Sequence, residues 1–146
     1  MPIKNYTTTI DPFKTAGEIE KMLVEHGAMA IMKTYENGQI SGISFMIDTG
    51  TQTIPVRLPA KIEECLEVLK KEKKANPKAQ IKLTEDQARK VAWRILKDWV
   101  DVQLALLDMK MVSFEEIFLS YIQTQDGKTI YEKLEERQFC LEQKDM

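Results

Sequence analysis

Few residues in this chain of 146 have the types and spacing that support chemistry. The run GKT at 127–129 matches the end of a phosphate-binding loop, but Ile122 stands where the opening glycine of that motif belongs. His26 is the single histidine, and it precedes Gly27 as expected at a helix C-terminus. We therefore predict no phosphate loop, no catalytic residue and no bound cofactor.

Carboxylates gather on one segment, at Asp98, Asp101 and Asp108, and hard cations favour such oxygen ligands. Arg94 and Lys97 stand among them, at the i,i+4 spacing that pairs opposite charges on a helix. We interpret this arc as a solvated helix face, and we predict no metal site.

Composition and cysteine usage limit the class of protein. Hydrophobic residues make up 43% and charged residues 30%, and the net charge is −2, so general attraction to nucleic acid or membrane is absent. Cys65 and Cys140 lie far apart and predict free thiols in a reducing compartment. The N-terminus has no apolar signal segment, and no run reaches the roughly 20 apolar residues of a membrane span. We expect a cytoplasmic protein without a membrane partner.

The strongest local charge feature is the run 70–82, which holds six lysines and one glutamate. We first interpret this run as an exposed connection between helices. The alternative is a basic patch for single-stranded nucleic acid, shared with the outward face of a sheet. The residues of that candidate patch are Lys33, Arg57, Lys70, Lys71, Lys73, Lys74 and Lys78.

The strands that would position these side chains follow from alternation of apolar and polar residues. Residues 3–10 are rich in β-branched types and predict a short first strand. Three further strands are expected over 28–35, 40–47 and 52–58, the first two joined by an Asn-Gly turn. Pro55 cannot donate to a strand ladder, so the last strand must be an edge strand or must turn Pro55 away from its partner.

Helices are predicted over 61–74 and 84–112, with a helix before the sheet and two short ones at the end. The segment 84–112 lacks Gly and Pro, and its apolar residues cover more than half of a helical wheel, which indicates a central buried helix. Capping boxes mark four helix starts. They are Thr15 with Glu18, Thr84 with Gln87, Ser113 with Glu116, and Thr129 with Glu132.

These elements predict an α+β fold in one domain over 1–146, with an antiparallel sheet of three or four strands covered on one face by helices. Within it, 15–74 forms an α-β-β-β-α unit and 84–139 a helical part. Apolar residues in 91–122 exceed what so small a sheet can cover, so we predict a homo-oligomer. Its interface residues would be Trp93, Trp99, Val100, Leu107, Phe114, Phe118 and Tyr121.

The order of elements over 15–74 resembles that of double-stranded-RNA-binding domains and of the core of phage strand-annealing proteins. The former place lysines at the start of the second helix, whereas here Glu63 and Glu64 follow Lys61. The sequences KTAGEIEKMLVEHGA, IPVRLP and ARKVAWRILKDWVDVQLALL together resemble a group of small bacteriophage and prophage proteins without an assigned activity. That resemblance implies a protein that works inside a bacterial host cell.

Three hypotheses for the function follow. The first is a non-enzymatic phage accessory protein that binds a host or phage macromolecule, which could include interference with host defence. The second is a single-stranded nucleic-acid-binding protein that uses the lysine run. The third is a small-molecule binder, for example of a nucleotide, or an enzyme, with its site between protomers.

Overall fold

The computed structural model describes residues 4–58 and 60–139, and it confirms the predicted α+β fold with one small sheet. The strands are β1 (Ala28–Glu36), β2 (Gln39–Asp48) and β3 (Thr53–Leu58). The helices are α1 (Pro12–Glu25), α2 (Ile62–Ala75), α3 (Glu85–Asp108), α4 (Phe114–Phe118) and α5 (Ile130–Glu136), with a 3₁₀ turn η1 (Leu119–Tyr121).

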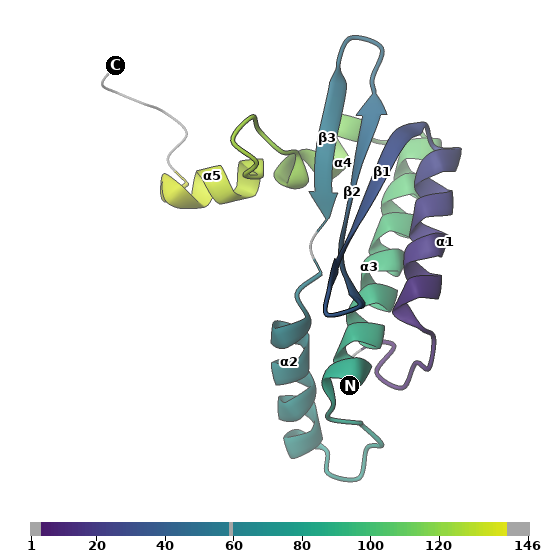
Figure 1. Ribbon diagram of the computed structural model, residues 1–146, viewed down its shortest axis with the longest axis vertical. Coiled ribbons are helices and arrows are strands. Elements are labelled where there is room, and N and C mark those ends of the chain that lie inside the picture. The colour runs from purple at the N-terminus through teal and green to yellow at the C-terminus, as the bar shows by residue number, and fades with distance from the viewer. Residues whose placement is uncertain (1–3, 59, 140–146) are drawn as a thin grey trace.

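The sheet is antiparallel in the order β1-β2-β3, and helices α1 and α3 cover one of its faces (Figure 1). The predicted alternation is confirmed, because Phe45 of β2 and Val56 of β3 are buried and directly paired. The neighbouring pair, Ser44 of β2 and Arg57 of β3, points to the opposite face. Within the described residues, no helix packs over that face along β1 and β2, which we call the open face (Figure 1).

Helix α3 occupies the predicted central position. Trp93 and Val100 are completely buried, and the helix packs against α1, α2 and the sheet. The helix ends at Asp108, before the predicted end at 112, because Lys110 takes a left-handed conformation with φ 61°. Met109, the residue that follows the helix, is 72% exposed.

The chain before α1 differs from the prediction, because the described residues 4–10 form turns and irregular structure instead of a strand. Asp11 caps α1, and its side chain accepts a hydrogen bond of 2.8 Å from the N–H of Phe13. Pro12 follows at the first helical position, where a missing N–H costs nothing. Because α1 begins at Pro12 and Asp11 is its N-cap, the predicted capping box of Thr15 and Glu18 is wrong.

Gln87 explains how the N-terminal segment is held. Its side-chain amide donates to the carbonyls of Tyr6 and Thr8, at 3.1 and 2.9 Å. The Thr84 hydroxyl accepts from the N–H of Gln87, but the Gln87 side chain does not return the bond, so only half of that predicted box forms. The boxes at Ser113 and Thr129 are confirmed.

The two edges of the sheet differ. At β3, Ile122 bridges Val56, and the carbonyl of Pro55 accepts a hydrogen bond of 2.9 Å from the N–H of Gln123. The carbonyl and nitrogen of one strand residue point the same way, so Pro55 faces away from β2, as the sequence required. At β1, by contrast, no backbone group of the described chain bonds to the outer edge.

Candidate functional site

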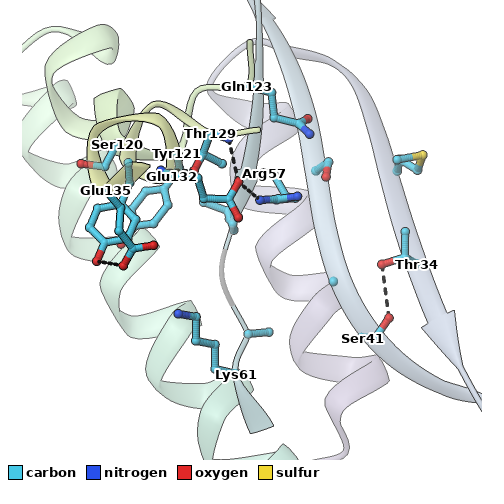
Figure 2. Close-up of a pocket in the computed structure, with 16 residues that line it drawn as sticks. Thr34, Ser41, Arg57, Lys61, Ser120, Tyr121, Gln123, Thr129, Glu132 and Glu135 are labelled. Carbon is cyan, nitrogen blue, oxygen red and sulfur yellow. Dashed lines mark hydrogen bonds and ion pairs between the residues drawn. The ribbon is translucent and has the colours of Figure 1, made fainter. Parts of the chain in front are cut away.

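A groove of about 660 Å³ lies on the open face, between the sheet and α5 (Figure 2). Met32, Ser44 and Arg57 form its floor as one row of directly paired residues across β1, β2 and β3. The wall of the groove is formed by η1, α5 and the segment between them. The residues of that wall are Ser120, Tyr121, Gln123, Thr129, Tyr131, Glu132 and Glu135.

An ion pair between Arg57 and Glu132 fixes α5 beside β3, with Nη2 and Oε1 2.6 Å apart (Figure 2). The same Glu132 oxygen accepts a hydrogen bond of 2.8 Å from the N–H of Thr129, which starts α5. The Thr129 N–H, and then the Arg57 guanidinium, hold the pKa of Glu132 below its usual range. The capping box thus positions the helix and anchors it to the sheet with one carboxylate.

The lining of the groove is about half polar and half apolar, and it has no net charge. Arg57 and Lys61 oppose Glu132 and Glu135, while hydroxyl groups and an amide supply donors and acceptors along the floor and wall. Thr34 and Ser41 are themselves hydrogen-bonded at 3.3 Å. Binding of a nucleic-acid backbone depends on Lys and Arg side chains, and this lining offers no surplus of them. The lining can therefore donate and accept hydrogen bonds, and Met32 and two tyrosines add apolar contacts.

The predicted basic patch does not assemble as one surface. Lys33 lies on the helix-covered face, where its amine is 2.6 Å from Glu20 of α1. The reason is a register shift between Thr34 and Tyr35, which places Lys33 opposite buried Ile43 instead of Gly42. One extra residue in a strand moves later side chains to the other face. The expected outward position of Lys33 is therefore wrong, whereas Arg57 does point outward.

The lysine run lies at the end of α2, and Figure 1 shows that this end of the helix points away from the sheet and from α5. The amine of Lys73 donates to the carbonyls of Pro77 and Ala79, at 3.0 and 2.6 Å, and so closes the loop after α2. Four other lysines are exposed and form no ion pair with any described residue. They are Lys70, Lys71, Lys74 and Lys78.

Four of the predicted oligomer-interface residues are instead part of the core of a single chain. Trp93, Val100, Phe114 and Phe118 are all at most 7% exposed, so a second copy cannot reach them. They pack between the sheet and the helices, with Phe118 making edge contacts to Phe45 and to Trp99. The other three, Trp99, Leu107 and Tyr121, are partly buried against the same core.

The residues first considered for chemistry have structural roles. In the GKT run, Thr129 caps α5 and Lys128 forms an ion pair with Glu136. Asp98 accepts from Asn5 at 2.8 Å, and Asp108 contacts the ring of His26 at 3.0 Å. The predicted pairing of Arg94 with Asp98 is replaced by an ion pair of 2.9 Å with Glu18.

Sequence reasoning missed the groove because its two sides are more than sixty residues apart in the chain, as Arg57 and Glu132 show. The alternation of β3 did indicate that Arg57 points outward. The Thr129/Glu132 box did indicate where α5 starts. No pattern in the sequence indicated that Glu132 would meet Arg57.

Comparison with protein-family models, with curated proteins and with solved structures finds no match to this chain. In the part of the chain that the structure describes, no helix combines the length and apolar character needed to cross a bilayer.

Proposed function

We propose that this chain is a non-enzymatic binding protein that recognises another protein inside a bacterial cell, with the groove on the open face as its binding site. The observation that carries this proposal is the neutral, hydrogen-bonding lining of a 660 Å³ groove, a volume within the range of ligand sites. Open sheet faces flanked by a helix are suited to extended or loop segments of a partner. The resemblance to phage and prophage proteins supports a target in the host cell, and host defence proteins are candidates.

The test is affinity capture from bacterial lysate with quantitative mass spectrometry. Ser44→Trp fills the floor of the groove without touching the helix-covered face, and it should abolish retention of the specific partner. Thr53→Trp is the matched control, because Thr53 is an exposed residue of the same open face outside the groove lining. Equal retention by both variants, or no protein retained by the wild type, would contradict the proposal.

A second candidate function is binding of single-stranded nucleic acid by the end of α2. Its support is the group of exposed lysines without an ion pair to any residue from 4–58 or 60–139. The opposing interpretation covers Lys74 of this group, which with Lys73 complements the helix dipole, because the first turn of α2 holds Glu63 and Glu64 and its last turn holds Lys73 and Lys74.

Fluorescence anisotropy with a labelled single-stranded oligonucleotide separates these interpretations. If the lysines bind phosphates, affinity falls steeply as salt rises, and replacing Lys70, Lys71, Lys74 and Lys78 by Gln removes it. Lys73 is left unchanged, because its amine holds the loop after α2. Affinity that survives this replacement would exclude the lysine surface as the site.

A further inference from the structure

We propose that β1 is a dimerisation edge, at which two copies of this chain pair their β1 strands antiparallel and join their sheets into one. Strand β1 has nine residues, contains no proline, and has β2 as its single strand neighbour in the described chain. An edge strand of this length whose outer backbone groups are unpaired within the described chain is a template for another strand. The opposite edge, at β3, is closed by Pro55 and the segment at 122–123.

The surface around this edge is unusually apolar. Five large hydrophobic side chains of α1 and β1 are each about half exposed or more. They are Phe13 at 49%, Val24 at 53%, Met29 at 61%, Met32 at 60% and Tyr35 at 52%. Phe13 stacks on Tyr35 with ring centroids 6.0 Å apart, and the Lys33–Glu20 ion pair lies next to them, so α1 and the helix-covered side of β1 form one continuous surface. Met32 projects from the other side of the same edge strand, toward the open face.

A second copy is the occupant that this surface fits, because the surface is complementary to itself. The α1–β1 turn makes the two elements antiparallel, so Phe13 and Tyr35 mark one end and Val24 and Met29 the other. A two-fold axis through Met32 places Met29 opposite Tyr35 of the second copy, a favourable sulfur–aromatic contact. The same axis brings Phe13 toward Val24 of the second α1.

Charges on the exposed flank of α1 agree with this pairing. Lys14 lies near the start of the helix and Glu25 at its end, and both are exposed. Antiparallel pairing of the two helices brings each Lys14 toward Glu25 of the other copy. Gly17, which is exposed near the middle and has no atom within 4 Å of its Cβ position, leaves room for close approach. Parallel pairing would instead set like charges together.

The first experiment uses sedimentation velocity on the full chain at up to about 100 µM, where interfaces of standard size associate. Wild type should be a dimer. Met32→Lys and Met32→Glu each set like charges at the axis and should weaken dimerisation about tenfold. An equimolar mixture of the two should restore it. Met46→Lys is the matched control, because Met46 is exposed on the open face of β2, away from the edge.

A competing surface at the end of α3 is tested in the same series by Met109→Lys, since Met109 is 72% exposed there. A monomeric wild type overturns the proposal. So does a dimer that Met109→Lys dissociates and Met32→Lys does not.

Disulfide formation tests the register independently of charge. Residues opposite each other at the axis have Cα atoms about 4.5–5.5 Å apart, within disulfide range. In a background without Cys65 and Cys140, Met32→Cys should form a covalent dimer rapidly under mild oxidation with copper phenanthroline. Thr34→Cys is the matched control, because its two copies would stand roughly 14 Å apart. Equal cross-linking of both positions, or of neither, overturns the register through Met32.

Discussion

Trp93 is the largest fully buried side chain, and its indole N–H has no hydrogen-bond partner among the residues that the structure describes. A buried donor without a partner costs free energy, while the ring itself fills the space between α3 and the sheet. The indole N–H of Trp93 therefore lowers the stability of the fold, whereas burial of its ring raises it.

We predict that Trp93→Phe lowers the free energy of unfolding by no more than about 1.5 kcal/mol, because it removes the unpaired donor together with part of the ring. Trp93→Ala should lower it by about 3–5 kcal/mol, because it leaves a cavity. Urea unfolding followed by circular dichroism measures both. A Phe variant as unstable as the Ala variant would show that the N–H is satisfied in solution.

His26 joins the ends of two helices, since Nδ1 contacts the carbonyl of Met22 at 2.7 Å and Nε2 contacts Asp108 of α3 at 3.0 Å. Burial lowers the pKa of His26, but the hydrogen bonds to Asp108 and Met22 outweigh it, so the pKa is raised above 6.5. A raised pKa means that the charged form stabilises the fold. That contribution is complete below pH 6.5, the unfolded value, and is lost as pH rises through the folded pKa.

Stability measured between pH 5.5 and 8.5 should therefore fall with pH in the wild type relative to Asp108→Asn. The difference should be below about 1 kcal/mol, because Asp108 is mostly exposed. Asp101→Asn, which changes an exposed carboxylate on the same helix, is the control. Parallel pH profiles for the wild type and Asp108→Asn would contradict this assignment.

At the scale of elements, α5 depends on one carboxylate for both its start and its position. We predict that Glu132→Ala accelerates amide hydrogen exchange throughout 130–136, because it removes the bond to the Thr129 N–H and the ion pair to Arg57. Amide hydrogen exchange in the strands should be unchanged. Glu135→Ala is the control, because Glu135 lies in the same helix and its carboxylate accepts a hydrogen bond from Tyr131 of that helix and none from Thr129 or Arg57. Unchanged exchange in α5 would show that apolar packing alone holds it.

The pH dependence of this anchor has the opposite sign to that of His26. The pKa of Glu132 is lowered from 4.5, so its contribution is present above pH 4.5 and is lost as pH falls through the folded value.

The elements themselves could largely be predicted from the sequence, since alternation in 40–58 and the wide apolar arc of α3 reflect local geometry. The first strand was predicted from β-branched residues alone, and tertiary contacts overrode it, because Gln87 holds the carbonyls of Tyr6 and Thr8. The face of the sheet to which Lys33 points depends on a register shift, and no residue type in the sequence indicates that shift. The groove required contacts between distant parts of the chain.

At the scale of the whole molecule, the apolar interior falls into two clusters. The larger one joins the sheet, α1, α3 and α4, whereas the smaller one lies between α2 and the first half of α3, around Leu69, Ile81, Ala88 and Val91. Figure 1 shows α2 extending beyond the sheet along α3. A helix that packs mainly on one neighbour can open before the rest unfolds.

We predict that native-state hydrogen exchange shows a separate opening of α2, at a lower free energy than the opening of the strands. Leu69→Ala should lower the α2 value by about 2–5 kcal/mol and leave the strand values nearly unchanged, because Leu69 is completely buried in the smaller cluster. Val68→Ala, at a half-exposed position on the same helix, is the control. A single opening shared by α2 and the strands would contradict this division.

The closed edge at β3 limits how far association can proceed. Pro55 offers no N–H outward, and its carbonyl is already taken by Gln123, so each copy presents one strand edge and not two. Growth of fibrils requires two such edges on every unit. If two copies pair through β1 as we propose, association is self-limiting: dimers form as the concentration rises, but larger assemblies do not. The joined sheet would then display two grooves on the same side, available to a divalent target.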